Sequence, residues 1–192
     1  MNRTLLPKPV RLLRIGSAFA AASYLLLLGC RLAGWIIPFT VLTGAMSPTV
    51  STRDHVLLEG FTYWFRQPHR GDVVVLKTRG VALLPPDQTC VKRLVGEPGE
   101  RLQIVADPML VEGQPVSIQN ATGELHYVSP PNSALLRSTN DPTTVPNGSY
   151  FLLGDNSTNS FDSRFWGPLP AKKVQGRVAF CYWSPRRIGW VK

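Results

Sequence analysis

The chain has 192 residues, and its 21 Lys and Arg outnumber its 12 Asp and Glu to give a formal charge of +9. Hydrophobic residues make up 44% and charged residues only 17%. This balance excludes a disordered chain, which needs low hydrophobicity, and a coiled coil, which needs abundant charge. The 16 Gly and 17 Pro favour short strands and turns over long helices. The length allows one domain and an appendage.

The excess positive charge does not indicate a nucleic-acid partner. The sequence contains no long run of basic residues, no zinc-finger spacing and no RNA-binding aromatic motif. Much of the excess lies near the two ends of the chain, where it suits the surface of a membrane.

An apolar segment near the N-terminus predicts a membrane anchor. Residues Ile15–Cys30 carry no charge, and after Arg31 the chain stays apolar as far as Phe39. Four basic residues, at positions 3, 8, 11 and 14, precede this segment. By the positive-inside rule they predict a cytoplasmic N-terminus. We therefore expect residues 1–38 to form a cytoplasmic tail and a single transmembrane helix in the plasma (inner) membrane. A cleaved signal peptide is the competing interpretation.

The remainder, residues 39–192, is predicted to be a mostly β domain outside the membrane. Short β-branched runs separated by turns are typical of strands. They occur at 56–60, 72–77, 90–95, 101–106, 149–154 and 174–183. Residues 108–145 are polar and rich in turn residues, which predicts an inserted β subdomain. Cys90 and Cys181 could pair, although two free thiols are the simpler interpretation. None of the three cysteines has a neighbour at metal-ligand spacing.

A cluster of aromatic residues lies between the first two of these strands. Four of the five residues from Phe61 to Phe65 are aromatic, which is more than one half-buried strand face needs. Aromatic rings are favourable at membrane–water interfaces. We therefore expect part of this cluster to meet a lipid bilayer.

Four segments, at 43–50, 70–77, 91–100 and 154–167, carry motifs that occur together in one protein family. In order and spacing they resemble the conserved boxes of bacterial type I signal peptidases, the Ser/Lys leader peptidases. The resemblance implies a membrane-anchored serine endopeptidase with a signal-peptidase-like β domain. Its partners would be the signal peptides of exported preproteins. It would need no metal or organic cofactor.

The resemblance makes Lys92 the general base. A free lysine has a pKa of about 10.4 and is almost entirely charged at neutral pH, so it must be buried to act as a base. On a strand, Lys92 would share one face with Cys90 and Leu94, which supply apolar neighbours. Arg93 on the other face cannot lose its proton and is excluded as the base.

The resemblance also assigns roles to residues around this lysine. Ser160 would orient the lysine amine, while Asp155, Asp162 and Arg164 would form a salt-bridged framework for the loop. The hydroxyl of Thr43 could join the backbone N–H of residue 45 in an oxyanion hole. Met46, Val50 and Val91 would line the pocket for the small side chains of the substrate.

One position departs from the family pattern. Where the family has a nucleophilic serine directly before a methionine, this chain has Ala45 before Met46. Three explanations are open: a Ser→Ala change made to inactivate the enzyme, a natural pseudoenzyme, or transfer of the role to Ser47. Ser47 precedes Pro48, which restricts it to extended conformations and disfavours the third explanation. We therefore expect an inactive form, and the alternative function is a non-catalytic membrane protein that binds preproteins.

Overall fold

The computed structural model describes residues 8–32, 34–104, 108–129 and 142–192. The chain divides into two compact units, Met1–Ile37 and Pro38–Lys192. In the first unit, helix α1 (Lys8–Leu32) contains the uncharged segment expected to form an anchor. Among the helices in the described parts of the chain, none combines the length and the apolar character needed to cross a membrane.

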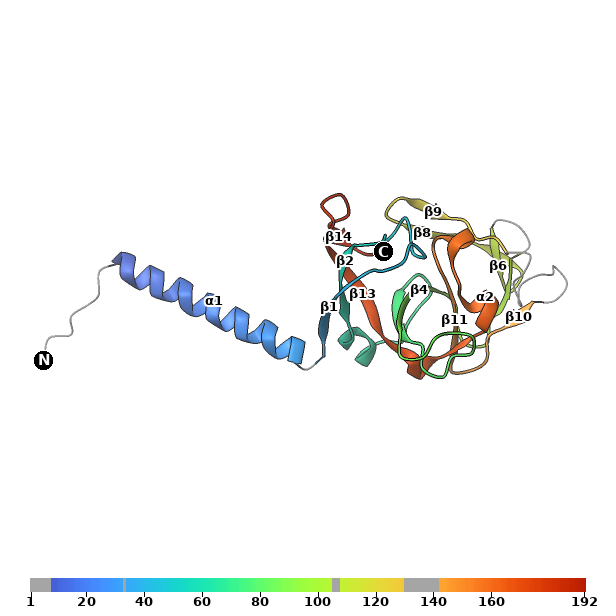
Figure 1. The fold of residues 1–192 in the computed structure, drawn as a ribbon, viewed down its shortest axis with the longest axis horizontal. Helices are drawn as coiled ribbons and strands as arrows, with labels where there is room; N and C mark the ends of the chain where they lie inside the picture. The colour runs from blue at the N-terminus through green and yellow to red at the C-terminus, as the bar shows by residue number, and fades with distance from the viewer. Residues whose placement is uncertain (1–7, 33, 105–107, 130–141) are drawn as a thin grey trace, which may run out of the picture. The chain divides into compact units, whose positions relative to one another are not determined.

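The second unit is built on one large curled antiparallel sheet (Figure 1). Its strands follow the order β1-β2-β13-β3-β4-β11-β12, and β14 pairs with β13. Their bounds are β1 Ile36–Thr40, β2 His55–Glu59, β3 Val73–Lys77, β4 Thr89–Gly96, β11 Ser149–Leu153, β12 Leu169–Pro170, β13 Val174–Trp183 and β14 Gly189–Trp190. Five of the six predicted strands thus lie within this sheet, with ends shifted by at most a residue or two. The prediction of a mostly β protein is confirmed.

The sixth predicted strand starts a second sheet that contains part of the predicted insertion. This sheet has the order β10-β5-β6-β7, with β5 Arg101–Gln103, β6 Met109–Val111, β7 Gln114–Val116 and β10 Thr143–Thr144. A separate hairpin joins β8 Ile118–Asn120 to β9 Gly123–Leu125. The rest of the predicted insertion, residues 130–141, lies outside the described residues.

Short helical turns fill several connections between the strands. They are η1 Phe61–Trp64, η2 Ser157–Asn159, α2 Ser163–Trp166 and η3 Ala171–Lys173. The aromatic cluster between the first two predicted strands forms one of these turns, η1, and is not part of a strand. In such a turn the side chains point in several directions, so the rings need not divide between two faces.

Strand β4 joins the hydrophobic clusters of this unit, because its side chains alternate between them. Cys90 packs with Leu94 in one cluster, whereas Val91 packs in a second and Val95 in a third. This alternation confirms the predicted division of the strand into two faces. Cys90 and Cys181 are both free thiols.

Candidate functional site

The site is centred on a buried lysine on β4. Lys92 lies directly opposite Val74 of β3, and its side chain is enclosed so that only 5% of the residue is exposed. Its Nζ donates a hydrogen bond of 2.8 Å to Oγ of Ser160, a residue that is itself 8% exposed. Burial lowers the pKa of the Lys92 amine, although the nearby Asp162 carboxylate acts in the opposite direction. A lowered pKa increases the fraction of neutral amine, which is the form that can accept a proton.

Residue 45 lies beside this pair, and Gly154 makes the close approach possible. A Cβ added at Gly154 would lie 2.1 Å from Oγ of Ser160 and 2.5 Å from the carbonyl oxygen of Ala45. The Ser160 hydroxyl and the Ala45 carbonyl therefore both lie close to Gly154, and any side chain at position 154 would clash with both. The backbone N–H of Asn156 donates to the Ala45 carbonyl at 3.1 Å. Three of the four sequence motifs thus converge on one place.

The other predicted site residues on the 43–50 segment occupy different environments. Thr43 is exposed, two residues before Ala45, and the side-chain amide of Asn156 donates to the carbonyl of Gly44 at 3.2 Å. Met46 and Val50 are 1% and 0% exposed and pack in a core cluster, against which the half-buried Val91 also packs. Of the three residues expected to line a substrate pocket, Val91 alone retains appreciable exposed surface in this structure.

The hydroxyl of Ser47 is engaged by a neighbour on its own segment. Its Oγ lies 3.0 Å from Oγ of Ser51, with which it shares a hydrogen bond. This contact keeps the hydroxyl within its own turn. This contact disfavours Ser47 as a replacement nucleophile, which needs a base within hydrogen-bond reach.

Asp155 is held by a buried ion pair that the sequence did not reveal. Nε and Nη2 of Arg93 donate to its two carboxylate oxygens, each at 2.7 Å, and both side chains are fully buried. Arg93 also donates to the carbonyl of Gly71 at 2.6 Å. Thr49 donates a further hydrogen bond to the Asp155 carboxylate. This pair therefore connects all four motifs.

A second buried ion pair shapes the loop that carries Ser160. Asp162 caps α2 by accepting from the backbone N–H of Arg164, and it pairs with the Arg164 guanidinium at 2.7 and 2.8 Å. The same carboxylate accepts from the N–H of Gly154 at 3.0 Å. Asp162 therefore fixes both the end of β11 and the start of α2, with Ser160 between them.

Residues of the predicted insertion also contribute to this framework, which sequence reasoning missed. Nη1 of Arg164 donates to the carbonyl of Val128 at 2.5 Å and to Oγ of Ser157 at 3.0 Å. The backbone N–H of Val128 donates to the same Ser157 oxygen at 2.8 Å. From β8, the amide of Asn120 donates to Oγ1 of Thr49 at 2.7 Å. The segment after β9 therefore supports the loop that carries Ser160.

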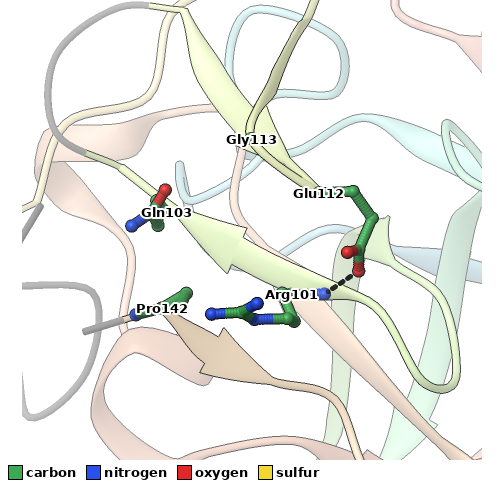
Figure 2. A pocket seen from close by; sticks show the side chains of 5 residues that line it. All are labelled: Arg101, Gln103, Glu112, Gly113 and Pro142. Carbon is green, nitrogen blue, oxygen red and sulfur yellow. Dashed lines mark hydrogen bonds between the residues drawn. The ribbon is translucent and has the colours of Figure 1, made fainter. Parts of the chain in front are cut away.

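A cavity of about 260 Å³ on the second sheet is unrelated to this site. Figure 2 shows its lining, in which the side chain of Glu112 accepts a hydrogen bond from the backbone N–H of Arg101. None of its lining residues belongs to the lysine pair or to the two buried ion pairs. Across the described residues, no group of three or more His, Cys, Asp or Glu is placed to hold a metal ion.

Comparisons with a family profile and with individual proteins point to the same family. Residues 13–183 match the profile of the family described as signal peptidase, peptidase S26. The chain is 34% identical to a signal peptidase I of Leptolyngbya laminosa over 76% of its own length and 68% of that protein. It is 32% identical to a probable thylakoidal processing peptidase 2 of Arabidopsis thaliana, over 90% of its own length and 44% of the plant protein. It thus spans about two thirds of the first relative and less than half of the second.

The buried Arg93–Asp155 pair should dominate the stability of this region. Asp155→Asn would leave a buried guanidinium without its counter-charge, which typically costs about 3–5 kcal/mol. Asp87→Asn is the matched control, because its pair with Arg79 is 61% and 76% exposed and should change stability by about 1 kcal/mol or less. Urea unfolding of the purified variants measures both. Similar midpoints for the two variants would contradict the importance of the buried pair.

Lys92 should make the stability depend on pH. Its pKa is lowered in the folded state, so the unfolded chain binds more protons between that pKa and about 10.4. The burial of the lysine is therefore unfavourable at neutral pH, and this cost is relieved as the pH rises toward about 10.4. The stability of the parent relative to Lys92→Met should rise with pH. Thermal unfolding from neutral to alkaline pH tests this, and a pH-independent difference would show that the amine titrates normally.

Proposed function

The chain belongs to the peptidase S26 family of signal peptidases, and we propose that it has the apparatus for Ser/Lys cleavage of preprotein signal peptides, lacking only the nucleophile at position 45. The observation that carries this proposal is the buried Lys92–Ser160 pair beside the carbonyl of residue 45. An ordinary surface lysine would have neither a lowered pKa nor a fixed hydroxyl partner.

The geometry suggests how the reaction would proceed with a serine at position 45. The serine oxygen would attack the carbonyl carbon of the scissile peptide, and its proton would pass to the neutral amine of Lys92. Ser160 would hold that amine in place. The backbone N–H of residue 45 and the Thr43 hydroxyl would donate to the developing oxyanion. Lys92 would then give the proton to the leaving amine, and water would hydrolyse the resulting ester.

The substrate would bind as an extended strand against exposed backbone, with small residues at the first and third positions before the cleaved bond. Val91 would contribute to the lining, and Met46 and Val50 would form the wall behind it. These assignments follow the family pattern together with the packing of the three residues in one cluster.

A non-catalytic, preprotein-binding protein is the second candidate function. It is favoured by Ala45 itself, whose methyl group cannot form a covalent intermediate, and by the engagement of Ser47 with Ser51. In this case the peptide-binding surface would persist without chemistry. The two candidate functions predict different results for Ala45→Ser, which places a hydroxyl at position 45: the first predicts cleavage and the second does not.

We also propose that α1 anchors the chain in the plasma membrane, with the N-terminus cytoplasmic and the β unit on the other side. Its segment Ile15–Cys30 carries no charge, and large apolar side chains such as Phe19 and Leu26 are 71% and 69% exposed. Exposed apolar surface on this scale is favourable only in contact with an apolar environment. The basic residues that precede the segment set the orientation.

Returning the hydroxyl should create activity. We expect Ala45→Ser to cleave a labelled preprotein with small residues at the cleavage site, and the unmodified chain to leave it intact. The rate should increase on the alkaline side of neutrality as Lys92 loses its proton. Gel analysis of the labelled product in detergent measures this. Absence of cleavage by a correctly folded Ala45→Ser protein would favour the binding function.

Two further variants test the roles of Lys92 and Ser47. Adding Lys92→Met to Ala45→Ser should reduce the rate by about 10²–10⁴-fold, the usual contribution of a general base. Adding Ser47→Ala instead should leave the rate nearly unchanged, because that hydroxyl pairs with Ser51. Cleavage by the unmodified chain that disappears in Ser47→Ala would place the nucleophile at position 47.

The proposed topology predicts a distinct protease pattern. Protease added to spheroplasts should digest the β unit and leave a small N-terminal fragment within the membrane. A cytoplasmic marker protein should survive the same treatment as the control. Complete protection of the β unit would overturn the proposed orientation.

A further inference from the structure

The loop that follows β11 holds the backbone on both sides of residue 45. The side-chain amide of Asn156 donates to the carbonyl of Gly44 at 3.2 Å, and the backbone N–H of Asn156 donates to the carbonyl of Ala45 at 3.1 Å. One residue thus contacts two consecutive carbonyls. Asn156 also lies on the same loop as Ser160, so the loop that carries the lysine's partner also holds the backbone at position 45.

These two contacts restrain the peptide units on either side of the Ala45 Cα atom. A peptide unit is planar, so a hydrogen bond that holds its carbonyl also restrains the rest of the unit. The Gly44 carbonyl belongs to the unit before this Cα, and the Ala45 carbonyl belongs to the unit after it. Because the Cα is tetrahedral, restraining both units also restrains its Cα–Cβ bond. Asn156 therefore influences the direction in which a side chain at position 45 leaves the backbone.

The first of these peptide units carries the N–H that would bind the oxyanion. In a trans peptide unit, the carbonyl oxygen of Gly44 and the N–H of Ala45 point in opposite directions. The Gly44 carbonyl accepts from two donors, the Asn156 amide at 3.2 Å and the N–H of Ser47 at 3.1 Å. The N–H of Ala45 is therefore directed away from these donors. Hydrogen bonds to the carbonyl also polarise the unit, which strengthens its N–H as a donor.

The side chain of Asn156 is itself held in this orientation. A carbonyl oxygen accepts and cannot donate, so only Nδ2 of Asn156 can bond to the Gly44 carbonyl. The other side-chain atom, Oδ1, accepts from the Thr158 hydroxyl at 3.4 Å. The backbone carbonyl of Asn156 accepts from the N–H of Asn159 at 3.0 Å, within the turn η2. Every polar group of Asn156 thus has a partner, which limits its freedom to turn away from position 45.

We propose that Asn156 is a positioning residue that aims the backbone N–H and the side chain of residue 45 for catalysis. This inference rests on the proposed function, in which a serine at position 45 is the nucleophile and its N–H binds the oxyanion. Asn156 acts through the Gly44–Ala45 peptide unit and exchanges no proton. Because the oxyanion exists only after attack has begun, the effect of Asn156 belongs to the transition state and not to substrate binding.

A single NMR signal reports this contact in the unmodified chain. The sequence contains one Gly-Ala pair, Gly44–Ala45. Labelling glycine with ¹³C at its carbonyl and alanine with ¹⁵N therefore gives one correlation between the Gly44 carbonyl carbon and the Ala45 amide. A hydrogen bond to a carbonyl oxygen moves the resonance of its carbon downfield. We expect Asn156→Ala to move this signal upfield in detergent micelles, and an unchanged signal would overturn the proposal.

The matched control is Asn159→Ala, the same change at an exposed position of the same loop. It keeps the backbone N–H that Asn159 donates to the Asn156 carbonyl. We expect this variant to leave the Gly44 carbonyl signal in place. Equal shifts in the two variants would reduce the effect to a general disturbance of the loop and overturn the specific role of Asn156.

The kinetics of Ala45→Ser measure the consequence for catalysis. Adding Asn156→Ala should lower kcat about 10²-fold, the usual effect of losing an oxyanion donor or of a misplacement of about 1 Å. KM should stay nearly the same, because the lost interaction forms only in the transition state. Adding Asn159→Ala should change neither constant. An unchanged kcat in the Asn156→Ala variant, or a loss carried by KM, would overturn the positioning role.

The pH profile separates positioning from a general loss of structure. Burial is the main cause of the lowered pKa of Lys92, followed by the opposing charge of Asp162, and the Asn156 side chain is uncharged. Asn156→Ala should therefore lower the rate by the same factor at every pH. A collapsed loop would expose the amine and return its pKa toward the ordinary value, which moves the profile to higher pH. A displaced profile would thus show a structural role and overturn the proposal.

Together these measurements separate failure of this inference from failure of the proposed function. An active Ala45→Ser whose kcat is unaffected by Asn156→Ala overturns the positioning role alone. A correctly folded Ala45→Ser that cleaves nothing overturns the proposed function and, with it, any catalytic purpose of Asn156. The NMR signal of the Gly44 carbonyl does not depend on activity, so it tests the contact itself in either case.

Discussion

The burial of the Lys92 amine is the constraint on which the rest of the site depends. An amine in an apolar environment is neutral more often than one in water, but only if no fixed negative charge lies close enough to restore its proton. Asp155 and Asp162 are both nearby, and both are engaged by guanidinium groups. The two buried ion pairs therefore serve two purposes: they hold the loop in shape, and they keep the carboxylates from holding the lysine in its charged form.

The sequence predicted most strands and the burial of Lys92, but it did not predict which residue pairs with Asp155. Alternation around Lys92 distinguished the two faces of β4, because a strand side chain has only two directions. Arg93 was considered and set aside, since it cannot act as a base. Its role depends on Asp155, which is 62 positions away, and nothing in the local pattern of an arginine on a strand indicates a distant partner.

The aromatic cluster and the insertion are two further places where the sequence pattern did not predict the contacts. The five residues with four aromatics were compared with what a strand face needs, but they form a 3-10 turn. Its Thr62 N–H donates to Glu59, and its Tyr63 hydroxyl donates to Asp72. Residues after β9 were interpreted as part of an excursion, yet Val128 contacts Ser157 and Arg164. In both cases hydrogen bonds determined the outcome, local ones for the turn and long-range ones for Val128, and hydrophobic patterning carries no information about them.

The long distances along the chain between the contacting residues have a consequence for when the site forms during folding. Lys92 meets Ser160 across 68 positions, Thr49 meets Asp155 across 106, and Gly44 meets Asn156 across 112. Contacts of such long range form late in folding, because the intervening chain must first be ordered. During synthesis the lysine therefore remains in water, with its ordinary charge, until the segment that contains Asp155 and Ser160 has emerged. A partly made chain cannot enclose the amine at this position, so the burial that lowers the pKa of Lys92 is established only when this segment joins the fold.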